Sequence, residues 1–241
     1  MSDTPYLSVV IPAYNETHRL GRTLSACLDY LAAQDYSAEI VVVDDGSSDD
    51  TAGLARGFSG GATPVRVLRF ERNCGKGAAV REGCLAAAGD HVLFMDADHS
   101  TRIDEVGQFL RLMQEDSYEV VVGVRTFQQG ESRMRRVVGL SFLILAHLIV
   151  FRKAVVDSQC GFKCFTREAA QRIFSLSLTN GGTIDVEIFS LVHRLDLSIY
   201  FQPVHWHNPP GSTISPLRCL VQDPVDMLRI RLRRYPTPDR T

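Results

Sequence analysis

The feature that most limits how this chain can fold is a regular alternation of short apolar runs with stretches of helical periodicity. The apolar runs are rich in β-branched residues and lie at 7–11, 40–43, 65–70, 91–95 and 118–124, the first of them ending at Pro12. Parallel strands joined by crossover helices produce this rhythm. We therefore predict an α/β fold with a mostly parallel central sheet that is covered by helices on both faces.

The rest of the chain adds few constraints on its organisation. Its 241 residues can bury a large core, and no low-complexity linker or internal repeat divides them. We predict one main domain over residues 1–214, followed by a C-terminal amphipathic basic helix and tail over residues 215–241. The formal net charge of -2 gives no general attraction to nucleic acid, so no nucleic-acid partner is expected. The sequence does not indicate an oligomeric state.

The N-terminal residues and the cysteines both favour a cytoplasmic protein. The segment MSDTPYLSVV lacks the basic start, apolar core and cleavage site of a secretory signal. The 6 cysteines form no CxxC pair, and none lies near a histidine at the spacing of a zinc site. We expect these cysteines to be reduced thiols.

Three of the apolar runs end directly in polar clusters that contain carboxylates. The clusters are Pro12-Ala13-Tyr14-Asn15-Glu16, Asp44-Asp45-Gly46 and Asp96-Ala97-Asp98. In open α/β sheets, ligands bind in the crevice beyond the carboxyl ends of the strands. Aspartate and glycine are also ordinary turn residues, which is the alternative for any single cluster. The coincidence of three clusters favours a binding site.

The third cluster predicts a metal site. Alternate residues of an extended segment project to the same side, so Asp96 and Asp98 can present two carboxylates to one cation. Mg²⁺ and Mn²⁺ bind one or two carboxylates and complete their shells with water and substrate phosphates. A phosphate-bearing ligand is therefore expected. The first strand leads into PAYNE and not into a GxGxxG turn, which argues against a dinucleotide-dependent oxidoreductase.

Together, four segments resemble family 2 of the glycosyltransferases, which has the GT-A fold. They read SVVIPAYNE, VVVDDGSSDDT, NCGKGAAVREG and FMDADHST. In the second half, DSQCGFKCFTREAA, TIDVEIF and WHNPPGS are similar to dolichyl-phosphate β-glucosyltransferases and, more loosely, to dolichol-phosphate mannose synthases. The resemblance implies an inverting, Mg²⁺- or Mn²⁺-dependent enzyme. It would move glucose or mannose from a UDP- or GDP-sugar to a polyprenyl phosphate.

The resemblance also assigns roles to individual residues on the donor side. The nucleotide pocket would be lined by Pro12, Ala13, Tyr14, Asn15 and Glu16. The base and ribose would meet Asp44, Asp45 and Gly46. Lys76 would face the diphosphate, although a solvated lysine is the alternative. Asp96, followed by Ala97, would contact ribose or metal, and Asp98 would be the principal metal ligand and a catalytic residue.

On the acceptor side, the resemblance places Arg125 near a donor or acceptor phosphate. Asp185 is the candidate for positioning the acceptor or acting as a base, with a helix-capping or salt-bridging carboxylate as the alternative. A base is not obligatory, because a polyprenyl phosphate is already anionic near neutral pH. The remaining acceptor-side candidates are Arg133, Gln159, Cys160, Gly161 and Trp206.

The chain departs from its relatives in three places. Mannose synthases often have glutamine where this chain has Ser100, which puts a third side-chain metal ligand in doubt. The segment after Trp206 continues with histidine and asparagine and not with an acidic residue. The glucosyltransferase relatives carry an N-terminal membrane helix, whereas this sequence begins close to its first strand.

Two segments predict peripheral attachment at the cytoplasmic face of a membrane. The run 137–151 is apolar almost throughout but shorter than the roughly 20 residues needed to span a bilayer, so a buried or interfacial helix is expected. Basic residues flank it on both sides: Arg133, Arg135, Arg136, Arg152 and Lys153. Further on, Pro216 and Pro224 mark two plausible helix starts, and arginines crowd the end of this amphipathic stretch.

Three other functions fit parts of the same pattern. A family 2 transferase that acts on a soluble or polysaccharide hydroxyl would share the donor site. A non-catalytic nucleotide-sugar sensor would also share it, although intact Asp96 and Asp98 argue against that function. A nucleotidyltransferase would normally have a glycine-rich basic loop after its first strand, and PAYNETHRL lacks one.

Overall fold

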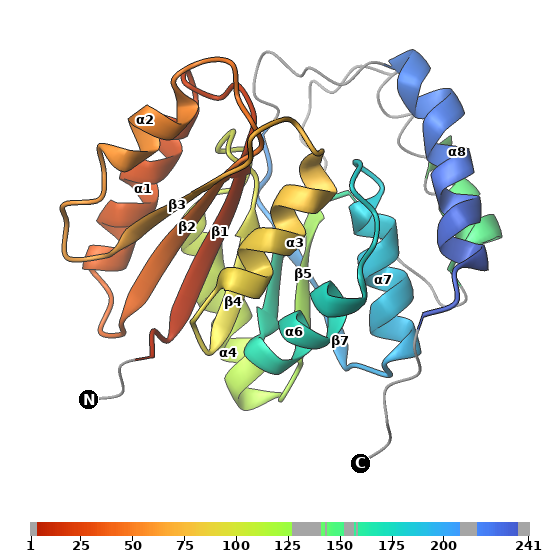
Figure 1. Cartoon of the computed structure of the whole chain (residues 1–241). Helices are drawn as coiled ribbons and strands as arrows, with labels where there is room; N and C mark the ends of the chain where they lie inside the picture. The colour runs from red at the N-terminus through yellow and green to blue at the C-terminus, as the bar shows by residue number, and fades with distance from the viewer. Residues whose placement is uncertain are drawn as a thin grey trace.

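The computed structural model describes residues 4–126, 141–142, 144–151, 157, 159–207 and 216–235, with the side chains of 216–221 left out. The described strands form one sheet in the order β3-β2-β1-β4-β6-β5-β7 (Figure 1). Their bounds are β1 (Leu7–Ala13), β2 (Ala38–Asp44), β3 (Val65–Arg69), β4 (His91–Met95), β5 (Val120–Arg125), β6 (Phe162–Thr166) and β7 (Ile199–Val204). Only β6 runs antiparallel to its neighbours, β4 and β5. The predicted mostly parallel sheet is confirmed.

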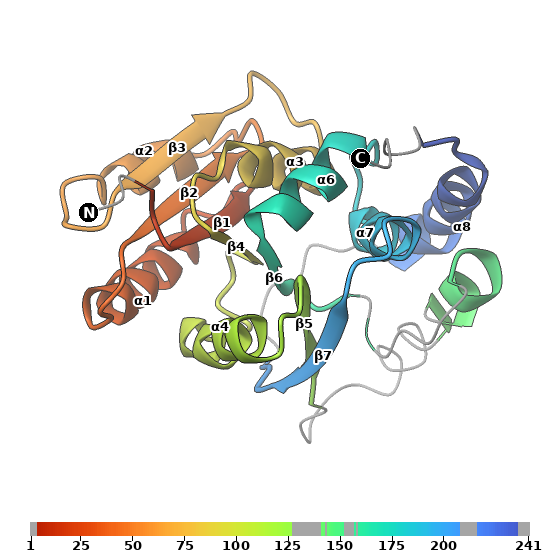
Figure 2. The ribbon, with the colours of Figure 1, turned by 90° about the horizontal axis from the view of Figure 1, so that it is seen from below.

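Helices cover both faces of the sheet, as predicted. Figure 2 shows α1 (Leu20–Ala32) and α4 (Val106–Glu115) on one face, and α3 (Lys76–Ala86) and α6 (Arg167–Leu176) on the other. A 3₁₀ turn at Ile103–Glu105 precedes α4. The remaining labelled helices are α2 (Thr51–Arg56), α7 (Ile184–Arg194) and α8 (Pro216–Leu232).

The alternation of side chains along each strand divides the core into two layers. In β1, Val9 and Ile11 pack in the cluster that contains α1 and α4, whereas Val10 packs in the cluster of α3, α6 and α7. In β2, Ile40 and Val41 divide in the same way. Successive residues of a strand point to opposite faces, so strands that are apolar at every position become buried on both sides.

The first strand does not end at Pro12, as the sequence predicts, but continues to Ala13. Proline has no N–H, so it fits a strand only where no neighbour needs that donor. The pairing of β1 with β4 ends at Val10, whereas the pairing with β2 continues to Ala13. Beyond Val10 the missing N–H costs no ladder hydrogen bond on the β4 side.

The C-terminal part forms a layer of its own against α7. Helix α8 is continuous through Pro224, so the second predicted helix start is wrong. Met227 and Ile230 of α8 pack with Val186 of α7 and with Ala146 and Val150, from the helical residues 144–149 and the turn after them. The predicted domain boundary at 214–215 lies outside the described residues. Among the residues that the structure describes, no helix is long and apolar enough to cross a bilayer.

Candidate active site

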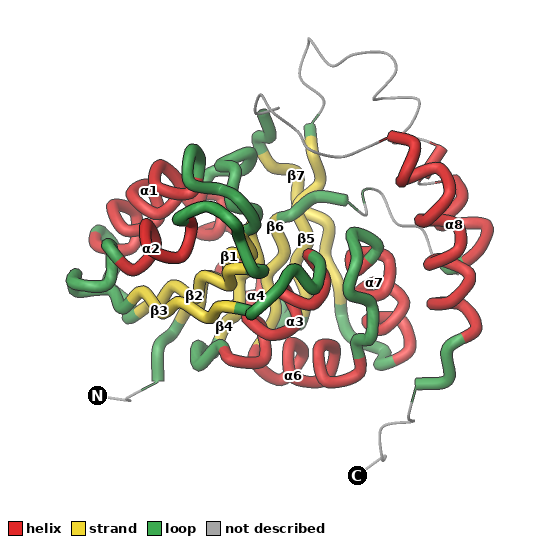
Figure 3. The backbone as a smooth tube through the Cα atoms, turned by 45° about the horizontal axis from the view of Figure 1, so that its top comes forward, coloured by secondary structure: helices red, strands yellow, loops and turns green. Residues whose placement is uncertain are grey.

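The loops after β1 and β2 are joined into one unit at the carboxyl edge of the sheet. Asn15 has a left-handed backbone, with φ of 55°. Its N–H donates to Ser47 Oγ at 2.9 Å, and its Oδ1 accepts from the N–H of Ser48 at 2.9 Å. The N–H of Glu16 donates to Thr51 Oγ1 at 2.8 Å. Figure 3 shows loops from several strands gathered at this edge. Tyr14, in the loop after β1, is about half exposed.

The two aspartates at the end of β2, Asp44 and Asp45, hold this edge together in different ways. Both oxygens of Asp45 accept backbone hydrogen bonds, from Cys74 at 2.7 Å and from Gly75 at 2.9 Å. Burial raises the pKa of Asp45, and these two hydrogen bonds oppose the shift. Asp45 therefore fixes the turn before α3, and its oxygens are occupied by protein donors.

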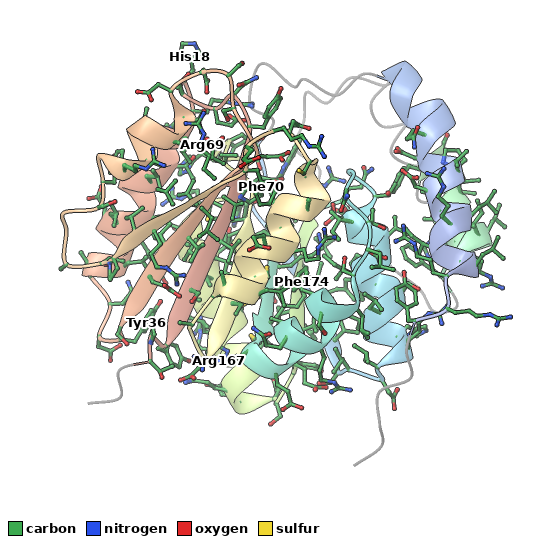
Figure 4. The ribbon with its side chains drawn as sticks, in the orientation of Figure 1. His18, Tyr36, Arg69, Phe70, Arg167 and Phe174 are labelled. Atoms are coloured by element: carbon green, nitrogen blue, oxygen red, sulfur yellow. The ribbon has the colours of Figure 1, made fainter. Side chains whose placement is uncertain are left out.

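Asp44 is fully buried and incompletely satisfied. Its Oδ1 accepts from the N–H of Ser47 at 3.0 Å. Its Oδ2 lies 3.2 Å from Arg69 Nε, yet the geometry makes no hydrogen bond and this oxygen has no other partner among the described residues. Arg69, labelled in Figure 4 near the end of β3, has a half-exposed side chain that covers Asp44. A buried acceptor without a donor is costly, so this oxygen can accept a hydrogen bond from a ligand.

The turn before α3 packs closely against the loop 177–182. Gly75 has φ of 101°, and a Cβ there would lie 2.3 Å from the carbonyl oxygen of Asn180. The same oxygen accepts the N–H of Gly77 at 2.8 Å. The amide of Gly77, the second residue of α3, is therefore used within the protein, and Lys76 is the group that this turn extends toward the neighbouring strand ends.

Lys76 and Asp96 form an ion pair at the carboxyl end of β4, with 2.7 Å between Nζ and Oδ1. Burial opposes the charge on Lys76, but Asp96, Asp185 and Asp98 outweigh it and raise the pKa of the lysine. About a third of the Lys76 side chain is exposed, so a ligand can reach it. Gly161 leaves room for Asp96, since a Cβ at Gly161 would lie 1.9 Å from Asp96 Oδ2.

Asp98 completes the acidic cluster. Its Oδ1 accepts the N–H of Ser100 at 3.0 Å, and its side chain is partly exposed. Burial raises the pKa of Glu16, and the charges of Asp98 and Asp96 add to the shift, which places all three carboxylates in one electrostatic neighbourhood. The described residues contain no group of three or more metal-type ligands. A cation that takes two carboxylates and fills its shell with phosphate and water needs no third side-chain ligand.

Asp185 lies in the first turn of α7 and is buried. Its Oδ1 accepts a hydrogen bond from Lys163 Nζ at 2.7 Å. Lys163 lies on β6, is completely buried, and also donates to the carbonyl oxygen of Cys160. Its ammonium lies 5.7 Å from the ring centre of Phe94, whose ring also has Lys76 Nζ at 5.4 Å. A buried pair of this kind fixes the position of the carboxylate.

Arg125, the last residue of β5, contacts Asp157 and Trp206. Its guanidinium binds both carboxylate oxygens of Asp157, at 2.7 and 2.9 Å, and lies 5.4 Å from the ring centre of Trp206. Trp206 forms a β-bridge with Thr101, and the N–H of His207 donates to the carbonyl oxygen of Ser100 at 3.0 Å. The structure therefore brings Trp206 beside the loop that carries Asp98.

Two of the other acceptor-side candidates, Gln159 and Cys160, follow shortly after Asp157 in the chain. The N–H of Gln159 donates to Asp157 Oδ1 at 3.0 Å. Cys160 is buried, and burial raises the pKa of its thiol to about 12. Five cysteines are free thiols in the described part of the chain. Arg133 lies outside the described residues.

Sequence reasoning did not single out Lys163 and Asp157. Lys163 could have been found, because a lone charge within the apolar strand FKCF must have a partner. Asp157 carries no such signal, since nothing in its neighbours indicates that it binds Arg125.

Known proteins resemble this chain over most of its length. Residues 8–174 match the family described as Glycosyl transferase family 2. The chain belongs to this family. It is 33% identical to a dolichyl-phosphate beta-glucosyltransferase of Dictyostelium discoideum, over 96% of the chain and 75% of that protein. It is 35% identical to the dolichyl-phosphate beta-glucosyltransferase of Mus musculus, over 96% of the chain and 76% of that protein.

Solved structures confirm the GT-A fold of this family 2 glycosyltransferase. Glucosyl-3-phosphoglycerate synthase from Mycobacterium tuberculosis, in complex with Mn²⁺, UDP-glucose and phosphoglyceric acid, superimposes with a TM-score of 0.72. The superposition covers 94% of this chain and 79% of that one, at 23% sequence identity. At this identity the likeness extends to the fold alone.

Proposed function

We propose that this glycosyltransferase moves glucose from UDP-glucose to a polyprenyl phosphate, with inversion at the anomeric carbon and with Mn²⁺ or Mg²⁺ as cofactor. The names of the relatives support the sugar and the lipid phosphate, and the glucosyl-3-phosphoglycerate synthase complex supports UDP and Mn²⁺. One observation carries the proposal. A lysine and two carboxylates meet at the carboxyl end of β4, where a cation and a diphosphate can be bound together.

The diphosphate would lie between Lys76 and the cation-binding carboxylates. In this structure Lys76 is paired with Asp96, and a diphosphate bound beside them adds a second anionic partner for the lysine. Asp96 and Asp98 would hold the cation, whose positive charge would offset the charge that develops on the leaving nucleoside diphosphate. Lys76 adds a positive charge at the same place, which stabilises the transition state in the way that fixed cations do.

The nucleoside would occupy the loops after β1 and β2. The buried Oδ2 of Asp44 can accept a hydrogen bond from the imide N–H of uracil once Arg69 moves aside. Tyr14, with its half-exposed ring, is suited to pack against the base or ribose. Asn15 and Glu16 would shape the pocket mainly through the backbone bonds that hold the two loops together.

The acceptor side favours a phosphate over a hydroxyl. Arg125 stacks on Trp206 beside the Asp98 loop, so its guanidinium would bind an incoming phosphate in competition with Asp157. A phosphate oxygen can attack the anomeric carbon without losing a proton. A hydroxyl acceptor requires a base, and Asp185 is buried and held by Lys163. We therefore assign Asp185 to positioning and not to proton transfer.

A lipid acceptor also fits the surface of the C-terminal layer. Ile144 and Leu148 are exposed beside α8, and Val225, Leu228 and Leu232 are exposed on α8 itself. We name these five residues the C-terminal apolar surface. Arg229, Arg231 and Arg234 are exposed on α8 or just after it. The flanking Arg135, Arg136, Arg152 and Lys153 lie outside the described residues. Apolar side chains next to exposed arginines are typical of a surface that binds anionic membranes from one side.

The direct test is transfer of radiolabelled glucose from UDP-glucose to a short-chain polyprenyl phosphate, with Mn²⁺ or Mg²⁺. We expect label in the organic phase, loss of transfer on chelation of the metal, and loss in Asp98→Ala but not in Asp116→Ala. Asp116 is an exposed aspartate at the end of α4, which makes it a matched control. GDP-mannose should be a poor donor. Label found only in a water-soluble glycan would instead establish a hydroxyl acceptor.

A further inference from the structure

Glu187 is a fully buried carboxylate that the proposed chemistry does not use. It lies on α7, and its Oε2 accepts a hydrogen bond from Ser177 Oγ at 2.7 Å. The same oxygen accepts the backbone N–H groups of Leu178 at 3.0 Å and Thr179 at 2.8 Å. Three donors on one oxygen fix the start of the loop 177–182.

The other oxygen of Glu187 binds the residues that directly follow α8. Oε1 accepts from Arg233 Nη1 and from the Tyr235 hydroxyl, each at 2.6 Å. Arg233 Nη1 also donates to Thr179 Oγ1 at 2.9 Å, and Arg194 lies 5.1 Å from the Tyr235 ring centre. Burial opposes the ionisation of Glu187, but its hydrogen bonds outweigh burial and lower its pKa. Arg233, one of the arginines at the end of the predicted amphipathic stretch, is therefore partly buried.

The loop that Glu187 fixes supports the turn that carries Lys76. The carbonyl oxygen of Asn180 accepts the N–H of Gly77 at 2.8 Å, and Arg81 Nη2 donates to Asn180 Oδ1 at 2.8 Å. The contact at Gly75 is so close that a methyl group there would overlap Asn180. Lys76 lies between these two glycines, so its position depends on where the loop 177–182 lies.

We propose that Glu187 is a positioning residue for the donor site, which acts through the loop 177–182 to hold Lys76 opposite the diphosphate. Arg233 and Tyr235 belong to the same support, so the last residues of the described chain determine donor affinity without touching the donor. Glu187 is enclosed by protein donors on both oxygens and acts only through its neighbours. The inference rests on the proposed function, because it requires a diphosphate beside Lys76.

The test is a double-mutant cycle on donor binding, measured by titration calorimetry with UDP-glucose and Mn²⁺ in the absence of acceptor. We expect Glu187→Gln to raise the Kd of the donor about tenfold, since it removes the charge that holds Arg233 and replaces an acceptor with a donor. Lys76→Met should raise the Kd at least as much. The double variant should bind like Lys76→Met alone, because Glu187 acts through Lys76. If the changes in the free energy of donor binding caused by Glu187→Gln and Lys76→Met add up in the double variant, the proposal is wrong.

Two further variants distinguish positioning from folding. Glu168→Gln makes the same chemical change at an exposed glutamate of α6 and should leave the Kd unchanged. If Glu187→Gln does not fold, Tyr235→Phe removes a single hydrogen bond to Glu187 and should raise the Kd two- to threefold, roughly the effect of one partial hydrogen bond. A folded Tyr235→Phe with unchanged donor affinity would refute the inference. A wild-type protein that binds no UDP-glucose would instead refute the proposed function.

Discussion

Gly161→Ala is the substitution whose effect the structure defines most narrowly. The new Cβ would lie 1.9 Å from Asp96 Oδ2 and 2.3 Å from Asp96 Cγ, whereas ordinary contact begins at 3.4 Å. The carboxylate would have to move by the difference between 3.4 and 1.9 Å, which is 1.5 Å. Such a shift separates Asp96 from Lys76 and from the proposed cation. A misplacement of about 1 Å costs roughly a hundredfold in rate, so we expect kcat/KM to fall about a hundredfold, or about 2.7 kcal/mol.

The same change should barely affect stability, which makes the prediction specific. The Lys76–Asp96 pair is partly exposed, and losing an exposed ion pair costs about 0.2 to 1 kcal/mol. We would measure glucose transfer, Mn²⁺ affinity and Tm together, with Gly60→Ala as control, because a Cβ at Gly60 meets nothing within 4 Å. Wild-type transfer and metal affinity in Gly161→Ala would refute the placement of Asp96 at the reaction centre.

Three further predictions follow from other contacts. Lys163→Met leaves Asp185 buried without its partner and should lower the free energy of unfolding, measured by urea denaturation, by about 3 to 5 kcal/mol. The double variant Lys163→Met with Asp185→Leu should recover at least half of this loss. Burial tends to raise the pKa of Glu39, but hydrogen bonds from Ala88, Ser8 and Arg66 lower it overall. A folded-state pKa below the unfolded value, which is near 4.3, stabilises the protein above pH 4.3, and this stability is lost as pH falls through the folded-state pKa. The free energy of unfolding of Glu39→Gln should therefore decline less steeply with acid than that of the wild type. Parallel plots of the free energy of unfolding against pH for the two proteins would contradict this. Leu148 and Leu232 are 79% and 77% exposed on the C-terminal apolar surface. Changing both to serine should weaken binding to anionic vesicles about a hundredfold, whereas the control Tyr200→Ser on β7 should not. Equal binding of the two variants would show that this surface does not contact the membrane.

Much of the site is predictable because its elements are local in sequence. An apolar run marks each strand, and a carboxylate directly after a run lies at the carboxyl end of the sheet whatever the rest of the chain does. The location of Asp44, Asp96 and Asp98 at this edge of the sheet is therefore predictable from the sequence alone. The prediction for Pro12 was wrong because its effect depends on where the neighbouring strand β4 ends, which the sequence around Pro12 does not contain.

The partners of the charged groups are the part that local sequence does not contain. Asp45 resembles a ligand-binding residue as much as Asp44 does, yet the structure gives its two oxygens to the amides of Cys74 and Gly75. Lys76 could have been solvated, and only the packing of α3 against β4 brings it to Asp96. Such long-range pairs depend on how the strands are aligned with one another and on where each helix packs on the sheet. Neither can be inferred from the sequence around a single residue.

The sequence alone thus determined a mostly parallel α/β sheet, the edge of that sheet at which the candidate site lies and the family to which the chain belongs, because periodicity and motif are properties of neighbouring residues. Only the tertiary structure decided that β6 enters the sheet antiparallel between β4 and β5, and that it carries Lys163 to Asp185. It also decided that Glu187 joins the C-terminal helix to the loop beside Lys76. These contacts form between elements far apart in the chain, and their geometry exists only once the core has packed.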